Sequence, residues 1–194
     1  MSDEYTTIST TSEGYYTEKR SKFLAFAHHV ETAEEVKHIV EDYRKKYYDA
    51  RHVCYAYMLG AERANFRAND DGEPSSTAGK PILGQINAAE LTDILIVVVR
   101  YYGGVNLGTS GLIVAYRTAA AEAIANATQE TRQVEEEVTF DFSYPLMNSV
   151  MRVVKEMQSR IVEQQFDNTC RLRMRIRQSE AETLRRKLSK LSFE

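Results

Sequence analysis

The chain has 194 residues, 43% of them hydrophobic, so it is long enough for two small domains with packed cores. Its 25 Lys and Arg and 28 Asp and Glu give a net charge of −3, which excludes binding to nucleic acid through overall charge. The two cysteines, Cys54 and Cys170, lack a disulfide-framework spacing and are typical of free thiols in a reducing compartment. The sequence has no signal-peptide pattern and no apolar run long enough to span a bilayer, so we expect a cytoplasmic protein without a membrane partner.

Strand and helix patterns alternate along the first two thirds of the chain. Strands are predicted at 5–10, 15–19, 23–30, 52–59 and 93–102, and helices at 33–47, from 79–81 to about 89, and at 112–127. Thr32 precedes Ala-Glu-Glu and is expected to cap the first of these helices. The run ILIVVV predicts a strand that is buried on both faces. Residues 60–78 are expected to form a long polar loop.

The last third of the chain predicts a second domain with the pattern β-α-β-β-α. Its strands are expected at 138–144, 160–166 and 170–177, and its helices at 146–157 and 179–191. A ferredoxin-like domain would contain one further strand at its end, which we expect to be missing. We therefore predict an α+β protein with a domain at 1–133 and a domain at 136–194.

The run NDDGEPSSTAGKP, residues 69–81, gathers polar side chains at the start of a predicted helix. Its carboxylates are Asp70, Asp71 and Glu73, and the side chains that follow include Ser75, Ser76, Thr77 and Lys80. Hard oxygens suit a cation, and hydroxyls before a helix N-terminus suit an anion. The alternative is an Asp-Gly turn followed by a helix cap, which the spacing alone favours. The clustering of three carboxylates and three hydroxyls weakens that alternative, because capping one helix does not need them all.

The run RYYGGVNLGTSG, residues 100–111, follows the buried strand and opens a helix. A glycine-rich loop in this position can approach a phosphate closely, although the spacing matches no nucleotide-binding fingerprint. Arg100 is either an anion ligand or the partner of the acidic loop, and Tyr101 and Tyr102 either stack on a base or pack. We expect loops 70–80 and 100–108 to form one ligand site, with Arg100 facing a carboxylate of the acidic loop. In that site the hydroxyls of Ser75 and Ser76 would face the backbone of Gly103 and Gly104.

No complete catalytic constellation can be named from the sequence. His52 and Cys54 lack the Glu and the Cys-x-x-Cys of the zinc deaminase pattern, so a structural strand histidine is favoured. No serine-based catalytic pair is evident either. We predict no cofactor and no metal, leave the catalytic residues unknown, and favour a non-enzymatic protein.

Four arginines recur at every second position of the predicted strand 170–177. They are Arg171, Arg173, Arg175 and Arg177, and together they make one face of that strand basic. Such a stripe could contact the phosphates of a nucleic acid. In a ferredoxin-like order, however, the neighbouring strand shows Glu137 and Asp141, which would pair with part of the stripe. The sequence leaves both alternatives open.

The combination of DDGEPSSTAGKPIL with VVRYYGGVNLG resembles the IMPACT family, which includes the bacterial YigZ proteins. The positions that match are Gly79, Ile82, Leu83, Ile86, Leu91, Val97, Val98, Arg100, Tyr101, Tyr102, Gly103, Gly104, Leu107 and Gly108. The resemblance implies an N-terminal domain with the fold of a ribosomal-protein domain, shared with elongation factor G and with GHMP kinases. It also implies a C-terminal ferredoxin-like domain similar to the last domain of elongation factor G.

The resemblance leads to two hypotheses about function. Eukaryotic relatives regulate translation through the co-activator of an initiation-factor kinase, but they do so with an extra N-terminal domain, so we do not carry that partner over. The favoured hypothesis is a non-enzymatic binding or regulatory protein that acts near translation through RNA or a ribosome-associated protein. The alternative is a phosphate-ligand-binding protein or enzyme that uses loops 70–80 and 103–111. The oligomeric state is left open.

Overall fold

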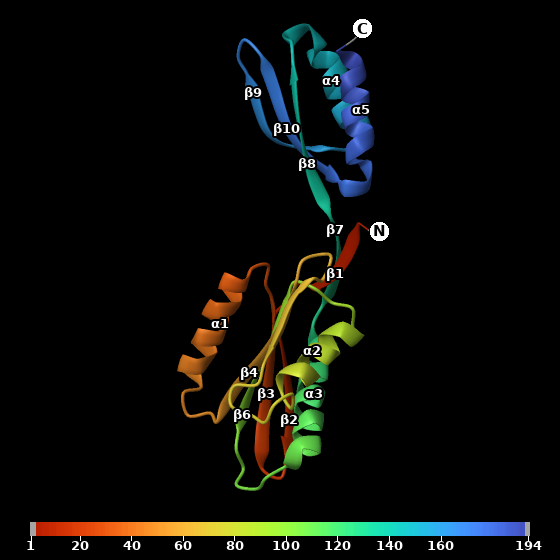
Figure 1. The fold of residues 1–194 in the computed structure, drawn as a ribbon. Helices are drawn as coiled ribbons and strands as arrows, with labels where there is room; N and C mark the ends of the chain where they lie inside the picture. Colours follow the sequence, from red (N-terminus) through yellow and green to blue (C-terminus); the bar gives the residue numbers. More distant parts are fainter. Residues whose placement is uncertain (1–2, 193–194) are drawn as a thin grey trace. The chain divides into compact units, whose positions relative to one another are not determined.

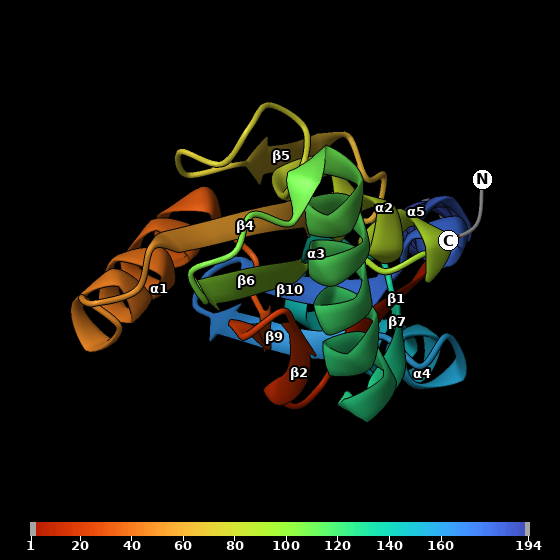
Figure 2. The same ribbon diagram turned by 90° about the horizontal axis from the view of Figure 1, so that it is seen from below.

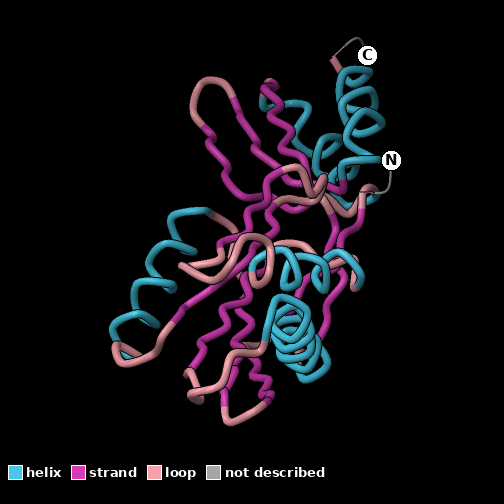
Figure 3. Tube along the Cα trace, turned by 60° about the horizontal axis from the view of Figure 1, so that its bottom comes forward, coloured by secondary structure: helices cyan, strands magenta, loops and turns pink. Residues whose placement is uncertain are grey.

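The computed structural model describes residues 3–192 and is an α+β protein, as the sequence predicts (Figures 1 and 3). The chain divides into two compact units. The N-terminal unit contains Tyr5–Arg132. The C-terminal unit contains the residues from Gln133 onwards together with Asp3 and Glu4. The sequence does not predict this placement of the first described residues.

The N-terminal unit is built on a five-stranded antiparallel sheet in the order β2-β3-β6-β4-β5. Its strands are β2 (Ser12–Glu18), β3 (Ser21–His29), β4 (His52–Leu59), β5 (Asn65–Asn69) and β6 (Ile94–Tyr101). Its helices are α1 (Ala33–Lys46), α2 (Gly79–Ala88) and α3 (Gly108–Asn126). The Thr32 hydroxyl accepts a hydrogen bond from the Glu35 amide, so the predicted cap of α1 is confirmed.

The sheet lies between two layers of helix. Figures 1 and 2 show α1 on one face and α2 and α3 on the other. Central strand β6 is buried on both sides: Ile96 and Val98 pack toward α2 and α3, whereas Val97 and Val99 pack toward α1. The prediction of a strand buried on both faces is therefore confirmed, here in an antiparallel sheet.

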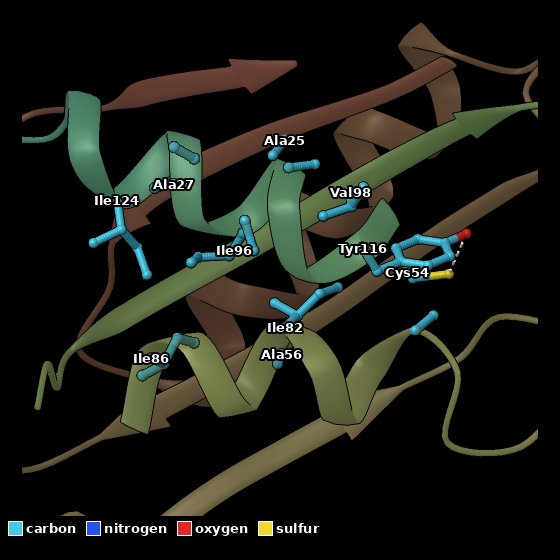
Figure 4. Close-up of a cluster of buried hydrophobic side chains, with 14 of the residues drawn as sticks. Ala25, Ala27, Cys54, Ala56, Ile82, Ile86, Ile96, Val98, Tyr116 and Ile124 are labelled. Atoms are coloured by element: carbon cyan, nitrogen blue, oxygen red, sulfur yellow. Dashed lines mark hydrogen bonds between the residues drawn. The ribbon is translucent and has the colours of Figure 1, made fainter. Parts of the chain in front are cut away.

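Small residues let α3 lie close to the sheet. Tyr116 and Ile124 of α3 belong to the same buried cluster as Ala25 and Val98 of the sheet, and Figure 4 shows Tyr116 beside Cys54. Gly14 of β2 shows the limit of this approach, because a Cβ there would lie 2.5 Å from the Ala119 carbonyl oxygen. Any side chain at position 14 would push the helix away from the sheet.

Two short polar strands lie where the sequence predicts none. The expected loop 60–78 contains β5, which pairs antiparallel with β4 at the edge of the sheet. Strand β7 (Gln129–Gln133) pairs with β1 (Glu4–Ile8) in a separate two-stranded sheet. Both β5 and β7 are mostly exposed, so their sequences lack the apolar alternation that marks a half-buried strand.

The C-terminal unit has the predicted β-α-β-β-α order. Its elements are β8 (Glu135–Phe142), a 3₁₀ turn (Tyr144–Leu146), α4 (Met147–Glu156), β9 (Arg160–Phe166), β10 (Cys170–Arg177), a second 3₁₀ turn (Gln178–Glu180) and α5 (Ala181–Leu191). The sheet order is β8-β10-β9, and the two helices bury its apolar face. This is the strand order of a ferredoxin-like domain with its fourth place, beside β8, unfilled by any strand of residues 3–192. The predicted start of that strand, 193–194, lies outside the described residues.

Candidate functional site

A buried ion pair joins the two loops that the sequence predicted to meet. Nη1 of Arg100, at the end of β6, lies 2.8 Å from both carboxylate oxygens of Glu73. The two side chains are 6% and 3% exposed. The sequence expectation that Arg100 faces a carboxylate of the acidic loop is confirmed, because residues at this depth require a charged partner.

Two further donors complete the shell around Glu73. The Tyr116 hydroxyl, from α3, donates to Glu73 Oε2 at 2.6 Å. His52 Nε2, at the start of β4, lies 3.0 Å from Glu73 Oε1. The other ring nitrogen of His52 lies 2.7 Å from the Asp71 carbonyl oxygen. Both ring nitrogens of His52 thus contact acceptors of the acidic loop, and Arg100 is the charged partner of the Glu73 carboxylate.

Cys54 belongs to the same hydrogen-bond network, but its thiol is not activated as a nucleophile. Its thiol donates to the Asp70 carbonyl oxygen at 3.1 Å and lies 3.4 Å from the Tyr116 hydroxyl, the contact dashed in Figure 4. Burial raises the pKa of Cys54 and of Tyr116 far above their ordinary values. Both groups are therefore neutral near pH 7, and neither is an activated nucleophile.

The other two carboxylates of the acidic loop bind backbone amides. Asp70 accepts from the amides of Ser76, Ala78 and Gly79 at 2.9–3.1 Å and so caps α2. Asp71 accepts from the Val53 amide at 2.7 Å. The contacts of Asp70 and Asp71 are those of a turn followed by a cap, and ligand binding by the acidic loop stays a prediction. Within residues 3–192, no three His, Cys, Asp or Glu side chains are grouped to hold a metal ion.

The hydroxyls of the acidic loop do not reach the glycine loop. The expected contact of Ser75 and Ser76 with Gly103 and Gly104 is wrong: the Gly103 amide donates to Ser21 Oγ at 3.1 Å. The reason is the register, since β3 lies beside β6 with Lys22 opposite Tyr101, and this brings Ser21 to the end of β6. Lys80 is exposed on α2.

A basic pocket opens beside the buried ion pair. It has a volume of about 410 Å³, and its lining includes Arg51, His52, Arg100, Tyr102 and the first residues of α3, Gly108 and Thr109. The Arg51 guanidinium lies 4.9 Å from the centre of the Tyr102 ring. Nε of Arg100 is buried and has no hydrogen-bond partner among the described residues. We call this cavity the basic pocket.

The first turn of α3 contributes donors to the basic pocket. The residue before the helix is Leu107, whose side chain cannot cap it. The first amides of a helix have no partner within the helix and attract anions. Two arginines, a histidine and free amides around a single carboxylate therefore make the basic pocket suited to a phosphate group.

The two tyrosines after Arg100 point in different directions. Side chains alternate along a strand, so Tyr101 lies on the α1 face, where its hydroxyl donates to Asp49 at 2.8 Å. Tyr102 lines the basic pocket and is 38% exposed. Of the predicted ligand residues, the structure thus places Glu73, Arg100 and Tyr102 at the pocket, together with Arg51 and Thr109, which the sequence analysis missed.

The arginine stripe of β10 is paired with carboxylates. Arg171 donates to Asp141 at 2.6 and 3.0 Å, Arg173 lies 2.7 Å from Glu163, Arg175 lies 3.1 Å from Glu135, and Arg177 lies 2.7 Å from Asp3. Hydrogen bonds from these arginines lower the pKa of Asp141 and Glu135. This geometry favours the alternative of a solvated, paired face, with RNA contact by the stripe remaining a prediction.

A model of the Impact N-terminal domain matches residues 19–124 of this sequence. The chain belongs to the IMPACT family. It is 34% identical over 158 residues to IMPACT family member YigZ of Escherichia coli (strain K12), covering 80% of this chain and 78% of that relative. An IMPACT homolog of Dictyostelium discoideum is 38% identical over 96 residues, which are 47% of this chain and 27% of that protein.

The fold is shared with a solved structure over nearly the whole chain. A crystal structure described as that of a hypothetical protein is 29% identical, with a TM-score of 0.76, and the match covers 99% of this chain and 94% of the other. The two-unit fold is therefore confirmed, while the specific likeness to elongation factor G stays a prediction. In residues 3–192, no helix is both long and apolar enough to cross a membrane.

Proposed function

We propose that this protein is a non-enzymatic binding and regulatory member of the IMPACT family that acts near translation and holds a phosphate of an RNA in its basic pocket. The observation that carries the proposal is the excess of basic side chains there: Arg51 and Arg100, with His52, line a pocket whose one carboxylate is that of Glu73. The link to translation is a family-level analogy. A ribosome-associated protein is the alternative partner within the same role.

The chemistry of the site supports binding rather than catalysis. Both ring nitrogens of His52 are engaged by protein groups, the Asp71 carbonyl oxygen and the Glu73 carboxylate, so neither is placed to take a proton from a ligand. Burial raises the pKa of the Cys54 thiol, which removes the nearest nucleophile. What remains is a set of fixed donors, which is what recognition of a phosphate requires.

Titration of the protein with a fluorescently labelled RNA at several salt concentrations tests the proposal. Arg51→Gln should weaken binding about fourfold at 0.15 M salt and reduce the salt slope by about 0.7, because one phosphate contact is lost. Arg117→Gln is the matched control, since Arg117 is exposed on α3 and lines no part of the pocket. Equal loss in the two variants, or no RNA binding by the natural protein, would contradict the proposal.

The second candidate is a phosphate-bearing small ligand in the same pocket. The concavity favours it, because a volume of about 410 Å³ is in the range of small-molecule sites. Calorimetric titration with pyrophosphate and with nucleotides separates the candidates. Saturable nucleotide binding that is lost in Arg51→Gln, without any affinity for RNA, would replace the first candidate by the second.

A further inference from the structure

One half of the α1 face of the sheet has no helix over it. The apolar cluster beneath α1 is centred on β4 and β6, and Figure 2 shows α1 beside β4 and away from β2. Tyr15 of β2, opposite Leu24 of β3, is 47% exposed. Lys22 of β3 lies opposite Tyr101 of β6 on the same face. This part of the sheet therefore presents side chains directly to solvent.

The uncovered part is hollowed and continues into the basic pocket. A hollow of about 600 Å³ is lined by side chains that include Tyr15, Arg20, Lys22, Tyr101 and Tyr102. Tyr102 also lines the basic pocket, so the two cavities share a wall. We call this hollow the open sheet face. It combines aromatic rings with cations in one concave surface.

The cations of the open sheet face are free, unlike those of β10. Within residues 3–192, no carboxylate lies within ion-pair distance of Arg20 or Lys22, or of Arg51 in the basic pocket, whereas each arginine of the β10 stripe has such a partner. The carboxylate in the hollow, that of Asp49, accepts the hydrogen bond of Tyr101. Unpaired cations are the ones that can exchange their counterions for phosphates.

The hairpin turn that carries Arg20 has a strained backbone, which suggests that the position of its side chain has a function. Lys19 and Arg20 form a two-residue hairpin turn between β2 and β3, and their φ angles are 47° and 68°. Asn-Gly is the usual choice there, because left-handed backbone is unfavourable for long side chains. The turn is pressed against Gly103, where a Cβ would lie 2.2 Å from the Arg20 carbonyl carbon. The strained turn thus holds a basic side chain at the rim of the hollow.

We propose that the open sheet face binds single-stranded RNA. Unpaired bases stack on Tyr15 and Tyr102, and the phosphates between them contact Arg20 and Lys22. Stacking requires bases that are not already paired, whereas a duplex offers only its phosphates to such a surface. The inference rests on the proposed function, because the strand continues toward the basic pocket, where Arg51 holds a further phosphate.

The test compares a labelled single-stranded RNA with a duplex of the same sequence. The natural protein should bind the single strand at least about tenfold more tightly. Tyr15→Leu should weaken that binding about fivefold or more, whereas Tyr144→Leu, at an exposed tyrosine of the C-terminal unit, should leave it unchanged. The double substitution Lys19→Asn, Arg20→Gly relieves the strain, so its melting temperature should be unchanged or higher while its affinity and salt slope fall.

The outcomes separate this inference from the proposed function. Equal affinity for the single strand and the duplex, or equal effects of Tyr15→Leu and Tyr144→Leu, would overturn the inference. If Arg51→Gln weakens RNA binding while every variant of the open sheet face keeps the affinity of the natural protein, the proposed role of the basic pocket is supported and that of the open sheet face is overturned. If the natural protein binds no RNA, both are overturned. Reduced affinity in the Lys19→Asn, Arg20→Gly variant at undiminished stability supports the open sheet face.

Discussion

The guanidinium of Arg100 and the carboxylate of Glu73 form a buried pair in which one nitrogen serves both oxygens at 2.8 Å. The pair does two things. It fixes the acidic loop against the end of β6. It also places the remaining N–H donors of Arg100 next to the basic pocket. Stability and binding are therefore coupled at Arg100, whereas Arg51 can be changed without touching the pair.

Replacing Arg100 by Ala should destabilise the N-terminal unit by about 3–5 kcal/mol, because the buried carboxylate of Glu73 would lose its guanidinium partner and keep only its contacts with His52 and Tyr116. Urea denaturation monitored on this unit measures the change. The double variant with Glu73→Ala should lose much less than the sum of the two single losses. Additive losses would mean that the two residues contribute independently. Lys80→Ala, at an exposed position, should stay within about 0.5 kcal/mol of the natural protein.

Asp70→Ala should cost about 1–3 kcal/mol, because three amides at the start of α2 lose their acceptor. The unfolding midpoint and the hydrogen exchange of those amides are the measurements. Ser75→Ala is the control from the same loop, since Ser75 is exposed and should have no effect beyond about 0.5 kcal/mol. Equal stability of the two variants would show that the cap does not hold the loop.

The C-terminal unit should be less stable in acid in a way that depends on Asp3. Hydrogen bonds from Arg177 and Ser179 hold the pKa of Asp3 well below its usual range. A lowered pKa in the folded state stabilises the fold above the unfolded pKa of about 3.9, and that contribution disappears as the pH falls through the folded value. Asp3→Asn should therefore destabilise the unit at pH 7 but match the natural protein near the acid limit.

Unfolding midpoints between pH 7 and pH 2 measure this effect. Added salt should reduce the difference at pH 7, because the Arg177 side chain of the pair is 34% exposed. Glu156→Gln, an exposed change in the same unit, is the control and should show no such convergence. A constant difference between Asp3→Asn and the natural protein at all pH values would assign the loss to packing.

The outer edge of β8 should exchange its amide hydrogens quickly. No strand of residues 3–192 pairs with that edge, although Arg185 of α5 donates to the Glu137 carbonyl oxygen at 3.2 Å. Alternate amides of 138–142 should therefore exchange fast in dilute protein, and Arg185→Ala should expose the edge further. Uniformly slow exchange along β8 at low concentration would indicate that another segment or another copy covers it.

The paired arginines of β10 should contribute little to RNA binding. The double substitution Arg173→Gln, Arg175→Gln would reduce the salt slope of RNA binding by about one to two units if both arginines contacted phosphates. Since both are paired with glutamates, we expect a smaller change than Arg51→Gln produces. A reduction of the salt slope by nearly two units would indicate that the RNA binds to this stripe and not to the N-terminal unit.

Most of the fold could be predicted because the core elements carry strong patterns. Strand β6 is marked by its apolar run and α1 by its cap, and each lies within a few residues of its expected place. Strands β5 and β7 could not be predicted, because edge strands with exposed polar side chains have the composition of loops. Their pairing is fixed by the neighbouring strand and not by their own sequence.

The candidate site could be predicted in part. The meeting of loops 70–80 and 100–108 follows from chain length and strand direction, and Glu73 could be named among three carboxylates. The other partners of the pair could not: Tyr116, which donates to Glu73, lies on a helix more than forty residues away, and Ser21, beside Arg100, is the first residue of β3. A lone polar aromatic within the alanine-rich helix was the available signal for Tyr116. The sequence gives no such signal for Arg51, because what suits it to bind a phosphate is the absence of an ion-pair partner in the folded structure.

The hydrogen bond between Asp3 and Arg177 joins residues 174 positions apart and so makes the C-terminal unit dependent on both ends of the chain. During synthesis, the segment 5–132 is complete well before β10 leaves the ribosome. At about 5–20 residues per second, Asp3 waits roughly 10–30 s for its partner. During synthesis there is therefore a period in which the N-terminal unit can already be formed while Asp3 cannot yet contact Arg177. A fragment beginning at Gln133 would lack Asp3 permanently.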